Sequence, residues 1–360
     1  MRGLVWDGTT LHVADDLQVR APGAGEVRVD IQAAGLCHSD LKPMDADIPQ
    51  PLPVVLGHEA VGVVTATGPG VKLRAGDRVV LSVLQSCGRC RACRDGQPTL
   101  CRDGSAGFTT PFERDGQAVH QFVRLGAFAQ QTVVREEQAI VVPAGVPDTA
   151  AALLGCAVIT AFGAVEERAR VRAGDKVLII GAGGIGLNVI QAARLAGAEL
   201  IAVADTNPRK DAIARRLGAT DVAIRASADE IEQQAMKLAP DGFDAVFECV
   251  GRADLLSVAV RALAYGGRAV IVGLPPAGTR LDLEIRSLGH DQALLGCRMG
   301  GVDPHTAIPR LAGLYLSGEL ELDPLVTKVV PMAAGAALVD DLRAGLLDRG
   351  LIDIAGVSAR

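Results

Sequence analysis

The sequence lacks an excess of basic charge, a long apolar run and an apolar segment near its start. Its formal net charge is −6, so we expect no positive surface that attracts nucleic-acid phosphates and no nucleic-acid partner. No apolar run reaches the roughly 18 residues of a membrane span, and the first residues lack the apolar core of a signal peptide. We therefore expect no membrane partner and a cytoplasmic location.

The length of the chain and the order of its patterns predict two domains. It has 360 residues, of which 49% are hydrophobic, and this is enough for two buried cores. Before residue 150, short valine-rich runs such as 26–31 and 60–64 are broken by Gly and Pro, which is typical of β-structure. From about Ala151, apolar strands alternate with amphipathic helices, which predicts a parallel, doubly wound sheet. Its predicted strands include 176–180, 200–204, 245–249 and 269–273.

Four of the eight cysteines lie close together in the sequence. They form the pattern C-x2-C-x2-C-x7-C, which consists of Cys87, Cys90, Cys93 and Cys101. A disulfide framework is typical of small secreted domains, so a metal site is the better interpretation in a chain of this length. Four thiolates suit one closed, tetrahedral, structural zinc ion. An iron–sulfur cluster and a zinc-ribbon nucleic-acid module are the alternatives for this spacing.

A glycine-rich turn follows the predicted strand 176–180. It reads Gly181-Ala182-Gly183-Gly184-Ile185-Gly186 and leads into a helical pattern at 187–196. Strand, turn and helix stand in the order that a dinucleotide-binding fold requires. Gly181 allows the tight turn, Gly183 allows a pyrophosphate to approach, and Gly186 allows close helix packing.

Asp205 ends the next predicted strand and bears on the choice of cofactor. Its carboxylate can accept hydrogen bonds from the adenosine ribose and repel a 2′-phosphate, so we expect NAD in preference to NADP. Arg209 and Lys210 follow closely and leave room for a minor use of NADP.

A second set of metal-binding side chains is spread over three segments. Cys37 stands beside Ser39 and Asp40, His58 follows Gly57, and Cys156 lies far downstream. Two thiolates and one imidazole form one of the known ligand sets of catalytic zinc, with a fourth position left open for water or substrate. The two complete ligand sets share no residue, so we expect two zinc ions per chain.

Together these motifs resemble the zinc-dependent alcohol dehydrogenases of the medium-chain dehydrogenase/reductase superfamily, over essentially the whole chain. The matching stretches are 35–40, 57–59, the four-cysteine lobe, 154–156, the glycine loop and 322–327. The resemblance implies an α/β protein with a GroES-like β catalytic domain and a Rossmann cofactor domain. We place the first domain at 1–156 with 299–360, and the second at 157–298.

The resemblance also implies roles for single residues. It places Cys37, His58 and Cys156 on the catalytic zinc, Glu59 beside the zinc, and Asp40 on His58. Ser39 would take the substrate proton. The residues that the resemblance implies for cofactor binding are His38, Gly181, Gly183, Gly184, Ile185, Gly186, Asp205, Lys210, Val272 and Leu274.

Two positions depart from the family pattern. Lys42 stands where many relatives end the proton relay with a histidine, and a lysine accepts protons at neutral pH only if its pKa is strongly lowered. The terminal segment 351–354 contains no arginine, whereas horse-liver-type relatives use one there for the cofactor pyrophosphate.

These features predict an enzyme that transfers a hydride between an alcohol and NAD. Val83, four residues before the cysteine lobe, stands where relatives can carry an aromatic that narrows the pocket, and only 3% of the chain is aromatic. The resemblance therefore implies room for a bulky alcohol, such as an aromatic or terpenoid one. The alternatives are a thiol-adduct formaldehyde dehydrogenase and a non-catalytic protein that binds NAD and zinc. Ser105 stands where glutathione-dependent relatives present an arginine to the adduct's carboxylate, which argues against a glutathione adduct but leaves a mycothiol adduct open. The apolar run 293–297 lies at the end of the predicted sheet, so we expect a homodimer or a dimer-built homotetramer.

Overall fold

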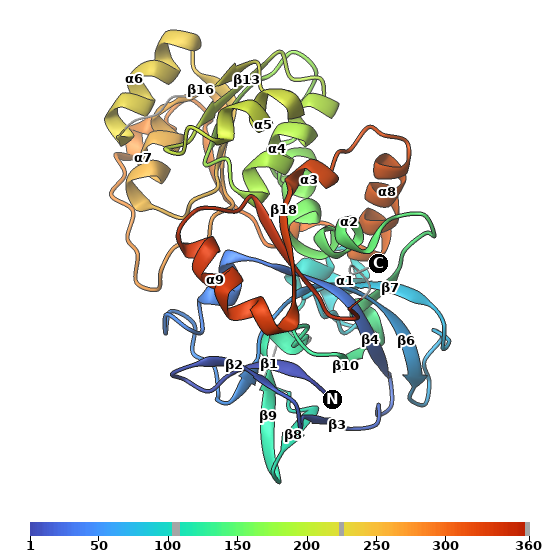
Figure 1. Ribbon diagram of the computed structural model, residues 1–360. Coiled ribbons are helices and arrows are strands. Elements are labelled where there is room, and N and C mark those ends of the chain that lie inside the picture. Colours follow the sequence, from blue (N-terminus) through green and yellow to red (C-terminus); the bar gives the residue numbers. More distant parts are fainter. Residues whose placement is uncertain (103–108, 223–226, 357–360) are drawn as a thin grey trace. The chain divides into compact units, whose positions relative to one another are not determined.

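The computed structural model describes residues 1–102, 109–222 and 227–356 and divides the chain into two compact units (Figure 1). The discontinuous unit comprises Met1–Cys156 and Asp303–Arg360, and the continuous unit comprises Ala157–Val302. The second boundary therefore lies after residue 302, whereas the sequence placed it after 298. Segment 299–302 stays with the continuous unit because Gly300 packs so closely on Gly163 that a Cβ on Gly163 would lie 2.5 Å from the Gly300 carbonyl oxygen.

Over residues 1–102, 109–156 and 303–356, the discontinuous unit contains two β-sheets. The six-stranded sheet has the order β2(Leu11–Ala14), β1(Gly3–Trp6), β5(Val54–Val55), β9(Gln117–Gln121), β8(Phe112–Arg114), β3(Gln18–Val19). The seven-stranded sheet has the order β11(Ala139–Val141), β7(Arg78–Leu81), β6(Glu59–Thr67), β4(Glu26–Leu36), β19(Arg349–Asp353), β18(Val326–Pro331), and β10(Gln131–Arg135) pairs with β4 in addition. The predicted β-structure of the first part is confirmed.

The C-terminal tail completes the seven-stranded sheet beside the N-terminal strands. Strand β19 pairs with β4 so that Gly350 lies opposite Leu36, and β4 pairs with β6 so that Gly35 lies opposite Glu59. The end of β4 therefore lies beside the starts of both β6 and β19. This register positions the candidate site.

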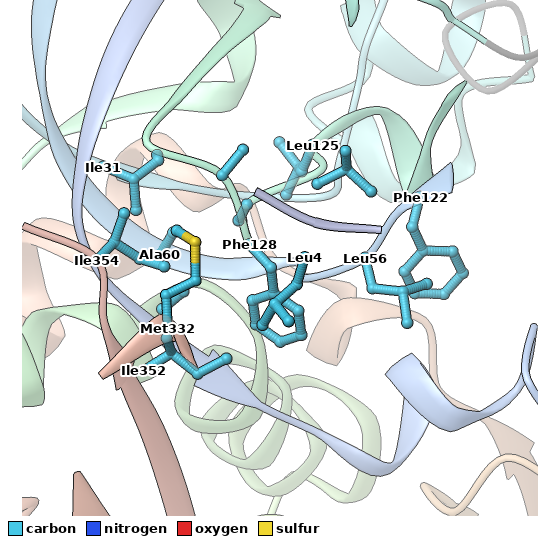
Figure 2. Packing of buried hydrophobic residues seen from close by; sticks show 14 of the residues in the cluster. Leu4, Ile31, Leu56, Ala60, Phe122, Leu125, Phe128, Met332, Ile352 and Ile354 are labelled. Carbon is cyan, nitrogen blue, oxygen red and sulfur yellow. The ribbon is translucent and has the colours of Figure 1, made fainter. Parts of the chain in front are cut away.

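A hydrophobic core holds the sheets of this unit together. In β4, burial alternates because successive side chains point to opposite faces, and Val27, Val29 and Ile31 all point into the core. Figure 2 shows Leu4 from the N-terminus and Met332 from the tail in the same cluster. Each such fully buried side chain contributes roughly 1.5–3 kcal/mol of transfer free energy.

Within its described residues, the discontinuous unit has the α-helices α1(Arg91–Arg94), α2(Asp148–Leu153), α8(Pro304–Leu316) and α9(Gly335–Arg343). The helical stretch Asp148–Ala169 contains α2 and has the length and apolar composition of a membrane span, which the search for apolar runs did not predict. However, 83% of its most apolar window is buried inside the protein. A core helix passes the same test, so the stretch is weak evidence for a span.

The described residues of the continuous unit form a parallel sheet with α-helices. The strand order is β14(Asp221–Val222), β13(Leu200–Ala204), β12(Lys176–Ile180), β15(Phe243–Glu248), β16(Leu263–Ile271), β17(Ala293–Gly296). The helices are α3(Ile159–Gly163), α4(Gly184–Leu195), α5(Lys210–Leu217), α6(Ala228–Leu238) and α7(Ala253–Arg261). The predicted parallel sheet is confirmed. The chain order reverses between β12 and β15, where such sheets bind ligands at the carboxyl ends of their strands.

Candidate functional site

The sheet register brings Cys37, His58 and Cys156 together within the discontinuous unit. Cys37 directly follows β4 and caps the 3₁₀ helix His38–Leu41, and His58 directly precedes β6. Cys156 lies in a π-helical turn, Leu154–Val158, after α2, and such turns are frequent at functional sites. Ligand atoms of these three residues and of Glu59 all lie within 4.8 Å of one another.

Asp40 fixes this arrangement from inside the 3₁₀ helix. In a helix with three residues per turn, residues 37 and 40 share one face. The Asp40 carboxylate accepts hydrogen bonds from the backbone of Cys37 (3.0 Å) and of Gly57 (3.1 Å), and it contacts Nδ1 of His58 at 2.8 Å. Burial alone would lower the pKa of His58, but the charge and hydrogen bond of Asp40 outweigh burial and raise it well above its usual value.

The donor set fits a zinc ion. Nδ1 of His58 is occupied by Asp40, whereas the buried Nε2 has no hydrogen-bond partner among the described residues, which costs about 1–3 kcal/mol unless a ligand satisfies it. A hydrogen bond from Cys156 and the neighbouring His58 lower the pKa of Cys37, and the thiolate is the form that binds metal. Phe122 packs edge-on against the His58 ring, with the two ring centroids 5.8 Å apart.

Arg349 is a residue of this site that the sequence analysis missed. It opens β19, is 5% exposed, and its Nη2 donates to Oε2 of the fully buried Glu59. Burial raises the pKa of Glu59, and the charge of Arg349 opposes this shift. Segment 351–354 contains no arginine, and Arg349 stands two positions before it. The sequence signal that could have identified Arg349 as a site residue is its place as a lone arginine at the start of an apolar strand.

The second cluster consists of the four spaced cysteines. Cys90 caps the short helix α1, which carries Cys93, and Cys101 is buried after the turn Pro98–Leu100. Sulfur atoms of all four cysteines lie within 4.8 Å of one another. Burial and the neighbouring thiols raise the pKa of Cys93 to about 12. Four thiolates therefore need a cation, and a closed tetrahedral zinc fits this set.

The glycine loop lies between β12 and α4 in the continuous unit. Gly181 has a φ of +97°, which favours glycine, and a Cβ on Gly186 would lie 1.9 Å from the carbonyl oxygen of Gly181. A Cβ on Gly183 would meet nothing within 4 Å, so the backbone there is open to a ligand. A cavity of about 130 Å³ is lined by both Gly181 and Asp205.

The remaining residues predicted for the site lie as follows. Ser39 is half-buried and His38 is exposed on the 3₁₀ helix. Lys210 is 9% exposed at the start of α5, and Leu274 is exposed after β16. The Val272 N–H donates to the Glu248 carbonyl.

Lys42 is engaged in an ion pair. Its Nζ lies 2.5 Å from Oδ2 of Asp47, and both side chains are largely buried, with exposed fractions of 18% and 16%. The structure therefore places the Lys42 side chain in an ion pair with Asp47.

Comparisons with known proteins agree with this geometry. Residues 23–144 match the family described as Alcohol dehydrogenase GroES-like domain, and residues 184–314 match the family described as Zinc-binding dehydrogenase. An S-(hydroxymethyl)glutathione dehydrogenase of Synechocystis is 34% identical over 90% of this chain and 91% of its own length.

Two solved structures are similar over 98% of this chain. An alcohol dehydrogenase zinc-binding domain protein from Burkholderia ambifaria has a TM-score of 0.91 and 33% identity, with 98% of its own chain covered. Benzyl alcohol dehydrogenase from Acinetobacter calcoaceticus has a TM-score of 0.90 and 30% identity, with 99% of its own chain covered.

These matches confirm the predicted GroES-like and Rossmann domain types. They also support an enzyme over a non-catalytic binding protein, because the relatives are named as dehydrogenases. Binding of zinc and of NAD or NADP follows from the family. The chain belongs to the zinc-dependent alcohol dehydrogenase family of the medium-chain dehydrogenase/reductase superfamily.

Proposed function

We propose that the chain oxidises a primary or secondary alcohol to the aldehyde or ketone with NAD, and that it runs the reverse reaction by the same path. The observation that carries this proposal is the buried Nε2 of His58, which has no hydrogen-bond partner in the described part of the chain and lies beside two cysteine thiols. Three protein ligands leave one zinc position open for a substrate oxygen.

The proposed roles follow from the chain's own contacts. Zinc held by Cys37, His58 and Cys156 would supply a Lewis acid that polarises the substrate oxygen. Asp40 fixes the tautomer and orientation of His58 through Nδ1. Arg349 holds Glu59 as a paired carboxylate beside the ligands. Ser39, half-buried on the same short helix, would pass the substrate proton toward solvent.

We infer a preference for NAD from Asp205. A carboxylate that lines the cavity beside the glycine loop can accept ribose hydroxyls and repels a 2′-phosphate. Comparing catalytic efficiency with NAD and NADP tests this point. A higher efficiency with NADP would contradict our interpretation of Asp205.

We favour an alcohol with a bulky or aromatic group. Val83 is a small aliphatic side chain that is only partly buried against the core, and one structural relative is named benzyl alcohol dehydrogenase. A screen of primary, secondary, benzylic and terpenoid alcohols with NAD is the direct test. Turnover restricted to small primary alcohols would contradict this proposal.

A thiol-adduct formaldehyde dehydrogenase is the second candidate. Curated relatives named S-(hydroxymethyl)glutathione dehydrogenase favour it. Ser105, at the position where glutathione-dependent members present an arginine, speaks against glutathione but lies outside the described residues. Formaldehyde oxidation that depends on added glutathione or mycothiol would establish this candidate in place of the first.

For assembly, we propose a dimer or dimer-built tetramer. Strand β17 ends the parallel sheet, and its residues Ala293, Leu294 and Leu295 are half-buried within one chain. Pairing with the same strand of a second copy would give hydrogen-bond partners to the backbone N–H and C=O groups along this edge. A monomer mass in light scattering at micromolar concentration would contradict the proposal.

Cytoplasmic location stays a proposal that rests on the sequence.

A further inference from the structure

The glycine loop has one fully buried side chain of its own, that of Ala182, to hold its backbone in place. Gly181 and Gly183 have no side chains, and a Cβ on Gly183 would meet nothing within 4 Å. Glycine also has the largest conformational freedom to lose on ordering. Because the loop must present its N–H groups to a pyrophosphate, other parts of the unit have to hold it.

The end of strand β13 provides this support through two consecutive hydrogen bonds. The Gly181 N–H donates to the carbonyl of Ala204 at 2.7 Å. The Ala182 N–H donates to Oδ2 of Asp205, also at 2.7 Å. The second bond uses a carboxylate as acceptor, and charge-assisted hydrogen bonds of this kind are shorter and stronger than neutral ones.

The other oxygen of the same carboxylate is also engaged. Oδ1 of Asp205 accepts from the Asn207 N–H at 2.7 Å. The carboxylate is therefore fixed on both sides and cannot turn away from the loop without breaking a hydrogen bond. Each carboxylate oxygen can accept about two hydrogen bonds, so acceptor capacity remains for a ribose in the adjoining cavity.

We propose that Asp205 is a positioning residue for the phosphate-binding loop in addition to its role as a ribose acceptor. Its carboxylate orders the loop through Ala182 before any cofactor binds. The proposal rests on the proposed function in so far as the loop is taken to bind a dinucleotide. It implies that a replacement made at Asp205 to admit NADP also weakens the pyrophosphate contact shared by both cofactors.

The decisive variant is Asp205→Asn. An asparagine has nearly the same shape and can still hydrogen-bond a ribose hydroxyl, but only one of its two terminal atoms is an acceptor. It therefore cannot accept from both Ala182 and Asn207. Asp205→Gly, which removes the side chain, serves as the second variant.

The chain offers a matched control at the other end of strand β12. The Lys176 N–H donates to Oδ2 of Asp244 at 2.8 Å, which is the same kind of bond between a carboxylate and a backbone amide. Asp244→Asn weakens this bond by removing the charge of its acceptor, without touching the loop. It separates a local effect on the loop from a general loss of stability in the sheet.

The first measurement is hydrogen exchange at the Ala182 amide in the full-length, zinc-loaded protein without cofactor. Asp205→Asn and Asp205→Gly should accelerate this exchange by about tenfold or more, the size expected for the loss of a hydrogen bond to a charged group. Asp244→Asn should leave it unchanged. Unchanged exchange in both Asp205 variants, or an equal acceleration in Asp244→Asn, would overturn the proposal.

The second measurement compares calorimetric binding of adenosine and of ADP. In Asp205→Asn, the advantage of ADP over adenosine should fall about tenfold, because the loop contacts the phosphates. An equal weakening of adenosine and ADP would mean that Asp205 acts on the ribose alone and would overturn the proposal. A wild-type protein that bound neither ADP nor NAD would refute the proposed function instead, while the exchange experiment would still decide on the loop.

Discussion

The guanidinium of Arg349 donates through Nη2 to Oε2 of Glu59, and both side chains are buried beside the candidate zinc ligands. The two residues lie 290 positions apart in the sequence. The pair therefore ties the C-terminal tail to the strand that begins next to His58.

Replacing Arg349 by Met should strongly destabilise the protein. The change leaves the Glu59 carboxylate buried without its partner, which costs about 3–5 kcal/mol of unfolding free energy. Urea unfolding of the zinc-loaded protein measures this loss. Arg343→Met is the matched control, since its pair with Asp45 is about 43–44% exposed and such pairs contribute about 1 kcal/mol or less. Equal losses in the two variants would show that burial of the Glu59 pair has no special effect.

Asp40→Asn should weaken zinc binding at the site of Cys37, His58 and Cys156. The amide cannot accept from the backbone N–H groups of both Cys37 and Gly57 and hold His58 with a negative charge. Loss of such a partner lowers metal affinity by about 10–100-fold. Competition with a chelator measures the affinity. Asp47→Asn, whose carboxylate pairs with Lys42 instead of a candidate zinc ligand, should leave it unchanged, and a normal affinity in Asp40→Asn would refute the role of Asp40.

Cys93→Ser should lower the zinc content from two ions per chain to one and destabilise the cysteine lobe, because structural zinc contributes to folding directly. Metal analysis together with thermal unfolding tests both effects. Cys249→Ser, at a half-buried cysteine outside both clusters, should keep two zinc ions. Iron in the purified protein, or one zinc ion in the wild type, would contradict the assignment of two zinc sites.

Tyr315 should titrate unusually late. Burial and the hydrogen bonds that its hydroxyl donates to Asp323 raise its pKa to about 12. Because the folded-state pKa lies above the ordinary value of 10.0, this interaction stabilises the protein below pH 10 and is lost as the pH rises through about 12. Ultraviolet titration of the wild type against Tyr315→Phe isolates this phenol. An isolated component near pH 10 would contradict the prediction.

Local sequence patterns were sufficient for the parts of the fold and site that depend on neighbouring residues. The strand, glycine turn and helix around Gly181 are confirmed, because hydrophobic periodicity and the conformational freedom of glycine act over a few residues. The spacing of Cys87 to Cys101 likewise brings four sulfurs together over one short segment.

Other features depend on pairing between distant strands and were not accessible from the sequence. Arg349 reaches Glu59 only because β19 pairs with β4, a register that no local pattern specifies. The second contact of Asp205, with Ala182, likewise requires the parallel pairing of β12 and β13. Lys42 stood out in the sequence as a departure from the family pattern, but its pairing with Asp47 depends on the path of the intervening turn.

The most direct test of the account is NADH formation from a panel of alcohols by protein of known zinc content, in the wild type and in Cys156→Ala. The wild type should contain two zinc ions per chain and produce NADH. Cys156→Ala should contain one zinc ion, keep a normal unfolding transition and produce no NADH above background. Undiminished NADH formation by Cys156→Ala with one zinc ion, or no NADH from any alcohol by wild type with two, would contradict the proposed function.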